Sequence, residues 1–192
     1  MSALNILQFM SRVIGILFVL CYANQFLYVL VALWRKRRKK QSPSAPIRRY
    51  AVLVSARNEE AVIGQLIESV RAQDYPAEYI TAFVVADNCT DATAQKAREA
   101  GAVVYERFDK RLVGKGYALN YLLDHIREDY GDEHFEGYFV FDADNLLAPD
   151  YVTRMNESFS GDCQIVTSYR NSKNYGDNWI SAGYGLWFLR DA

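Results

Sequence analysis

The sequence has little that could support a disulfide framework or a zinc-centred fold. Its 192 residues include only three cysteines, Cys21, Cys89 and Cys163, and these are widely scattered. Zinc sites and disulfide frameworks need cysteines at short, paired spacings, so free thiols in a reducing cytoplasm are expected. A chain of this length corresponds to about one domain, held together by an ordinary hydrophobic core.

Acidic residues are absent from residues 1–49, which hold nine of the 22 lysines and arginines. The rest of the chain therefore holds 13 basic and 23 acidic residues, a net charge of −10. An acidic body repels the phosphates of DNA and RNA, so we expect no nucleic-acid partner. The basic stem instead suits the anionic head groups of a membrane.

Charge is also nearly missing from residues 1–34, where Arg12 is the only charged side chain. The run from Phe9 to Trp34 is long enough to cross a hydrocarbon core about 30 Å thick. Because the basic block 35–40 follows this run, whereas a signal peptide carries its positive charge first, we predict a transmembrane anchor. An amphipathic helix lying in the membrane interface is the alternative, which the scatter of polar residues disfavours.

The same charge pattern predicts orientation and domain organisation. The positive-inside rule places the N-terminus outside and the remainder at the cytoplasmic face of the inner (plasma) membrane. We therefore expect an anchor over residues 1–34, a basic juxtamembrane linker over 35–49 and one globular domain over 50–192.

The globular part alternates between apolar runs and helical patterns. Five strands are expected: at 50–55, in the apolar run that ends at Ala86, at 102–107, at 137–142 and at 162–171. Helices are expected at 62–70, from the N-cap Asp91 to Gly101, and at 117–126. Such alternation is typical of an α/β domain with a mainly parallel sheet covered by helices on both faces.

Polar clusters follow three of these strands. They read "ARNEE" after the first, "DNCTD" from Asp87 and "DADN" from Asp142. Ligands of open parallel sheets bind outside the carboxyl ends of the strands, where the three clusters would converge. With Asp87, Asp142 and Asp144 exposed on one rim, the pattern indicates a binding site.

Asp142 and Asp144 are separated by one residue at a strand exit. Oxygen ligands of this kind suit Mg²⁺ or Mn²⁺, which usually keeps waters or substrate phosphates as its other ligands. The alternative is structural: Asp142 would accept backbone N–H bonds in a turn, and Asp144 would cap the next helix. That alternative is the better one for an isolated Asp-x-Asp, but three converging clusters favour the metal.

Lys115 lies between two glycines in "GKGYALN", at the start of a predicted helix. Backbone N–H groups and an ammonium at such a position could hold phosphate. The segment is not a Walker loop, because the required upstream glycine is missing and Lys115 is followed by glycine. Without the other motifs, a solvated surface lysine would be the better interpretation.

Four motifs together resemble a known family. "VSARNEEAVIGQLIESVRAQDYP", "VVADNCTDAT", "GKGYALN" and "FVFDADNLLAPDY" occur in the order found in the donor half of membrane-associated, inverting family 2 glycosyltransferases of the GT-A fold. The resemblance covers about residues 50–175. It implies a nucleotide-diphosphate sugar donor, most often linked to UDP, a divalent metal, and a lipid or polysaccharide acceptor.

The resemblance also implies roles for individual residues. Ser55, Arg57 and Glu59 would line the nucleotide pocket, and Asp87 would accept a hydrogen bond from the base. In the remaining motifs, Lys115 would lie near the diphosphate, Asp142 would contact the ribose or the sugar, and Asp144 would ligate the metal.

The chain departs from the family pattern downstream of Asp144. The acidic pair that carries the general base and the Gln-x-x-Arg-Trp segment of processive members do not occur before Ala192. Since inverting transfer needs a base for the acceptor hydroxyl, we expect the domain to be incomplete at its C-terminus and the base to lie beyond Ala192.

Two other interpretations remain open. One is a haloacid-dehalogenase-like phosphatase, which also places Asp-x-Asp at a strand exit, but on the first core strand and with Thr or Val where this chain has Leu146. The other is a non-catalytic, membrane-tethered module that binds a nucleotide sugar.

Overall fold

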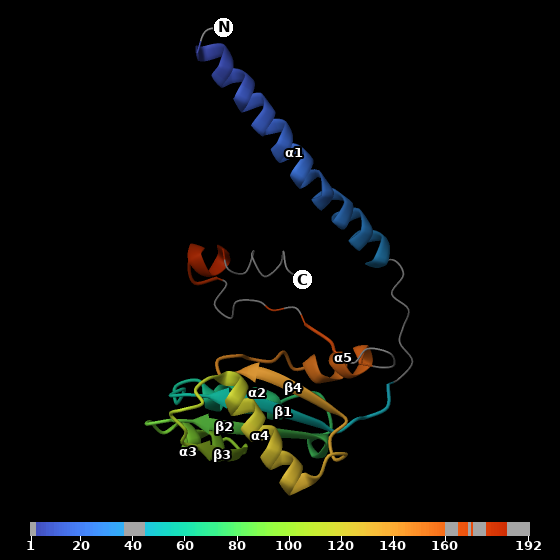
Figure 1. The fold of residues 1–192 in the computed structure, drawn as a ribbon. Helices are drawn as coiled ribbons and strands as arrows, with labels where there is room; N and C mark the ends of the chain where they lie inside the picture. The colour runs from blue at the N-terminus through green and yellow to red at the C-terminus, as the bar shows by residue number, and fades with distance from the viewer. Residues whose placement is uncertain (1–2, 37–44, 160–164, 169, 171–175, 184–192) are drawn as a thin grey trace. The chain divides into compact units, whose positions relative to one another are not determined.

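The computed structural model describes residues 3–36, 45–159, 165–168, 170 and 176–183 (Figure 1). The chain divides into two compact units, Met1–Pro43 and Ser44–Ala192. Each unit is described by itself.

The first unit is built on one helix, α1 (Ala3–Lys36). Its segment Leu4–Ala23 has a mean hydropathy of 1.9, and none of this segment is buried. By its length and composition the segment could cross a membrane. At about 1.5 Å per residue, a helix needs about 20 apolar residues for this. The segment Leu4–Ala23 overlaps the predicted run from Phe9 to Trp34 but begins earlier in the chain.

The second unit contains a parallel sheet of four strands in the order β3-β2-β1-β4. The strands are β1 (Tyr50–Ala56), β2 (Ile80–Asp87), β3 (Val103–Arg107) and β4 (Gly137–Asp142). The four predicted strands, and their parallel arrangement, are confirmed. Central strands buried on both faces explain why "YAVLVSA" and "ITAFVVAD" are nearly continuous apolar runs.

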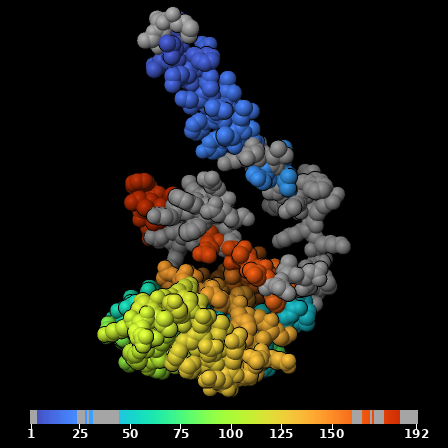
Figure 2. Space-filling model, viewed as in Figure 1, coloured from blue at the N-terminus to red at the C-terminus, as the bar shows by residue number. Residues whose placement is uncertain are grey.

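Helices cover both faces of this sheet. They are α2 (Ile63–Arg71), α3 (Thr93–Glu99), α4 (Lys115–Tyr130) and α5 (Tyr151–Ser158), with a short 3₁₀ turn, η1 (Ala77–Tyr79). One core packs α2 and α3 against Val52, Val54 and Val84. The other packs α4 against Leu53 and Phe83. In Figure 2 the yellow atoms of α4 form much of the visible surface of this unit.

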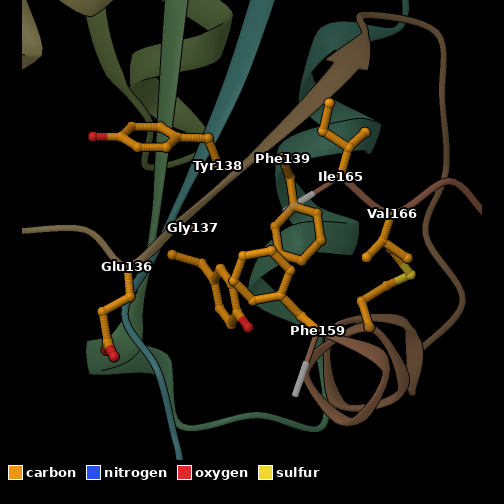
Figure 3. Close-up of a pocket in the computed structure, with 9 residues that line it drawn as sticks. Glu136, Gly137, Tyr138, Phe139, Phe159, Ile165 and Val166 are labelled. Carbon is orange, nitrogen blue, oxygen red and sulfur yellow. The ribbon is translucent and has the colours of Figure 1, made fainter. Parts of the chain in front are cut away.

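The predicted fifth strand is not found where the structure describes it. Residues 165–168 and 170 are not in a strand, and the rest of 162–171 lies outside the described residues. Ile165 and Val166 instead line a cavity of about 350 Å³ with Gly137, Phe139 and Phe159 (Figure 3). Val166 is half-buried, whereas Ile165 is 87% exposed, so this apolar segment packs against the domain only in part.

This cavity lies away from the predicted binding rim. Gly137 is the first residue of β4, so the cavity is at the amino end of the strand, whereas Asp142 marks its carboxyl end. The Tyr50 ring packs so closely there that a Cβ on Gly137 would lie 2.5 Å from Tyr50 Cε1. The predicted site residues end the strands at the opposite edge.

Candidate functional site: the carboxyl edge of the sheet

Three predicted site residues share one face of the sheet at its carboxyl edge. Leu53 and Val85 belong to the core under α4, so the period of two in a strand places Ser55 and Asp87 on that same face. Ser55 is the register partner of Asp142 across β1 and β4, which brings Asp142 to that face too. The face covered by α4 therefore carries these three predicted site residues.

Lys115 joins this group as the first residue of α4. Its Nζ pairs with Asp142 Oδ1, and both side chains are about half exposed. The preceding Gly114 has φ +137°, a conformation that glycine adopts readily, and it starts the helix at this edge. Because an exposed ion pair contributes little to stability, a ligand can displace it at low cost.

The segment from Asp142 to Asn145 forms a tight turn. Asn145 Oδ1 accepts the Asp142 N–H, and Asp142 O accepts the Asn145 N–H, both at 3.1 Å. The buried Ala143 points into the core, while the carboxylates of Asp142 and Asp144 are both exposed. The structure thus presents two carboxylates to solvent at the strand exit.

The structural alternative for these two carboxylates is not found in the described part of the chain. In the Asp142 turn the side-chain acceptor is Asn145, not Asp142. The next helix, α5, begins at Tyr151 with Asp150 as its cap residue, so Asp144 does not cap it.

The carboxylate oxygens at this turn fit a divalent cation that is coordinated partly by the protein and partly by a substrate. Within the described ranges, no group of three or more His, Cys, Asp or Glu side chains could hold a metal by itself. Asp142 and Asp144 would supply at most two carboxylates. A magnesium or manganese ion commonly completes such a set with water and substrate phosphate.

Asp87 lies at the rim, but it is not exposed as predicted. It is 4% exposed, and its Oδ1 accepts hydrogen bonds from Arg107 Nη1 at 2.6 Å and Asn88 Nδ2 at 3.0 Å. A buried carboxylate needs such a partner because desolvation of an unpaired charge is costly. Arg107 was missed by the sequence analysis; its only signal is a basic residue at the end of the strand "VVYER".

The segments that follow β1 and β2 are joined by hydrogen bonds. Asn58 Oδ1 accepts the Thr90 N–H at 2.8 Å, and Thr93 Oγ1 accepts the Glu59 N–H at 2.8 Å. Arg57 is exposed and Glu59 is half-buried in this paired structure. The first and second polar clusters are therefore brought together, as the parallel sheet predicts.

The predicted N-cap of α3, Asp91, lies one position too early, since the helix begins at Thr93 and the cap residue is Ala92. The Asp91 carboxylate still accepts the Thr93 N–H, at 3.0 Å, and the Thr93 hydroxyl donates to it at 2.5 Å. The hydroxyl hydrogen bond lowers the pKa of Asp91 below its usual range. Asp91 thus anchors the start of α3 as an ionised side chain.

Comparison with known sequences identifies the family. The profile of "Glycosyl transferase family 2" matches residues 51–190. A beta-monoglucosyldiacylglycerol synthase from Synechocystis sp. is 28% identical over 155 residues, covering 78% of this chain and 31% of that protein. The low-salt glycan biosynthesis hexosyltransferase Agl6 of Haloferax volcanii is 40% identical over 80 residues, covering 42% of this chain and 19% of that protein. The chain spans about a third or less of these relatives.

A solved structure supports the same assignment. The mannosyltransferase PcManGT from Pyrobaculum calidifontis, in complex with GDP-Man and Mn²⁺, matches with a TM-score of 0.54 and 28% identity. The match covers 77% of this chain and 44% of that chain. The predicted GT-A architecture, with one apolar helix before the sheet, is confirmed. The chain belongs to glycosyl transferase family 2.

Proposed function

We propose that this chain carries the donor site of a membrane-associated hexosyltransferase. In this proposal it binds a nucleotide-diphosphate sugar, with UDP as the nucleotide, for transfer to a lipid or polysaccharide acceptor. The observation that carries the proposal is the convergence of Ser55, Asp87, Asp142 and Lys115 at one sheet edge. Ligands of open α/β sheets bind at this edge.

Each residue is assigned a task from its place at the edge. Asp87 accepts a hydrogen bond from the base, and Ser55, Arg57 and Glu59 line the nucleotide pocket. Lys115 leaves Asp142 to hold the diphosphate, which frees the Asp142 carboxylate for the ribose or the sugar. Asp144 is the proposed ligand of Mg²⁺ or Mn²⁺, a Lewis acid that stabilises negative charge on a departing diphosphate.

The acceptor half of the reaction needs more than these residues. Inverting transfer requires a general base that takes the proton of the attacking hydroxyl. The residues assigned above do not include this base, and the chain spans 31% of the Synechocystis relative. The Synechocystis relative is named for monoglucosyldiacylglycerol, which supports a lipid among the acceptors proposed here.

Calorimetric titration of the full chain in detergent micelles tests the donor site. We expect UDP to bind at least ten-fold tighter with Mn²⁺ than without it, and tighter than GDP or CDP. Preferred binding of GDP would replace the proposed nucleotide, whereas no metal-dependent binding by a folded chain would contradict the site.

The two alternatives are separated by activity. Sugar transfer, or slow hydrolysis of the donor, by the purified chain would exclude a purely non-catalytic binding module. The family match favours a transferase over the phosphatase, and only a trapped phosphate on Asp142 would favour the phosphatase again.

We further propose that the GT-A domain lies on the cytoplasmic side of the membrane. The basic block after α1 supports this orientation through the positive-inside rule. With an epitope at the C-terminus, we expect protease to remove the tag in inside-out vesicles and to leave it intact in right-side-out vesicles. The reverse pattern would contradict the orientation.

A further inference from the structure

Arg107 ends β3 directly beside Asp87, its register partner on β2. The side chains of both residues are only 6% exposed. Each of the other ion pairs in the described part of the chain includes a side chain at least 34% exposed. Burying two charges is costly unless their geometry and hydrogen bonds are good, so this pair calls for an explanation beyond stability.

The guanidinium of Arg107 holds two parts of the site at once. Its Nη1 donates to Asp87 Oδ1 at 2.6 Å, while its Nη2 donates to Leu112 O at 2.7 Å and lies 3.3 Å from Asp109 Oδ2. Asp87 is the proposed base acceptor. Leu112 and Asp109 belong to the loop 108–113, which leads into Gly114 and Lys115.

That loop is ordered around the Asp109 carboxylate. Asp109 Oδ1 accepts the N–H groups of Arg111 at 2.7 Å and Leu112 at 3.1 Å, and these hydrogen bonds lower the pKa of Asp109. Asn88 adds a second link, because its Nδ2 donates to both Asp109 O and Asp87 Oδ1. The base side and the phosphate side of the site therefore share one hydrogen-bond network.

The network also determines which oxygen of Asp87 a nucleotide can use. Among the described residues, both hydrogen bonds to the Asp87 carboxylate fall on Oδ1. Oδ2 is then the oxygen available to a donor group on a base. A lysine could not reproduce this arrangement, because its single ammonium lacks the planar fork that reaches two acceptors in fixed directions.

We propose that Arg107 is a positioning residue that couples recognition of the base to binding of the diphosphate. It orients Asp87 toward the base, and the same guanidinium holds the loop that brings Lys115 to the phosphates. This inference rests on the proposed function, since it takes Asp87 as the base acceptor and Lys115 as the diphosphate ligand.

The experiment compares Arg107→Lys with Asp87→Asn in the full chain in micelles, both with Mn²⁺. One readout is the ratio of the UDP and CDP affinities, which reports on the base pocket. The other is the affinity for inorganic pyrophosphate, which reports on Lys115 and its loop. Asp87→Asn should lower the ratio at least five-fold and leave pyrophosphate binding within two-fold of wild type.

Arg107→Lys should change both readouts, with a ratio at least five-fold lower and pyrophosphate binding at least five-fold weaker. Arg98→Met is the matched control, because Arg98 of α3 forms an exposed ion pair with Glu106, the residue of β3 that precedes Arg107. It should change neither readout. Thermal unfolding of each variant checks that the fold is kept.

If Arg107→Lys does not fold, Asp109→Asn tests the loop end of the network with less disturbance of the core, and should weaken pyrophosphate binding at least three-fold. Loss of only one readout in Arg107→Lys, or no change in Asp109→Asn, would overturn the coupling role. Failure of the proposed function gives another pattern: wild type binds no nucleotide, or Asp87→Asn leaves the choice of base unchanged.

Discussion

Replacing Asp144 with alanine should abolish the metal-dependent part of nucleotide binding. Asp144 is exposed in the turn after β4, and its Oδ1 accepts a 3.3 Å hydrogen bond from Asn145 Nδ2. The side chain therefore contributes little to the fold, and its loss should leave the melting temperature within about 2 °C, as expected of an exposed site. The ten-fold gain in UDP affinity on adding Mn²⁺ should fall below two-fold.

Asp150→Ala is the matched control for this prediction. Asp150 is another carboxylate of the same connection, and it forms an ion pair with Arg154 of α5. Titrations of UDP with and without Mn²⁺ should be unchanged in this variant. A normal manganese effect in Asp144→Ala would rule out Asp144 as the metal ligand.

Replacing Lys115 with methionine should change two affinities in opposite directions. Without nucleotide, the Lys115 ammonium is paired with Asp142 Oδ1, so removing the ammonium makes the Asp142 carboxylate available to Mn²⁺. An exposed pair is worth about 0.2–1 kcal/mol, so Mn²⁺ alone should bind up to about five-fold tighter. With nucleotide, the loss of a charge-assisted hydrogen bond of about 1.5–3 kcal/mol should weaken binding of the UDP–manganese complex about 10- to 150-fold.

Lys110→Met controls for the loss of a positive charge near the same edge. Lys110 is exposed in the loop before α4 and makes no ion pair in the described part of the chain. Manganese binding by calorimetry, without and with UDP, should stay within two-fold of wild type. A shift of both affinities in the same direction in Lys115→Met would contradict the exchange of Lys115 between Asp142 and phosphate, and equal shifts in Lys110→Met would assign the effect to overall charge.

The sequence alone determined the local elements and the side of the sheet on which to look for function. Apolar runs of strand length and intervening helical patterns predicted β1 to β4 and α2 to α4, because period and burial are local properties of a chain. The glycine before Lys115 marked the start of α4. The parallel arrangement then followed from the alternation of the elements, and it placed the polar clusters at one edge.

The fifth strand shows the limit of such local patterns. "IVTSY" has strand-forming residues, but a strand also needs a neighbour with free backbone groups in register. In the described part of this segment, Ile165 and Val166 lie around a cavity beside Phe139 and Phe159. Only the tertiary structure shows that the described residues of this segment are not in a strand.

The electrostatics of the site were likewise decided by the tertiary structure. Asp87 and Arg107 are 20 residues apart, and nothing local relates them; the register of β2 with β3 makes them neighbours. The same register logic across β1 and β4 puts Ser55 beside Asp142, and the start of α4 brings Lys115 to that carboxylate. Sequence pattern determines which residues end strands, whereas pairing register and helix packing determine which charges meet.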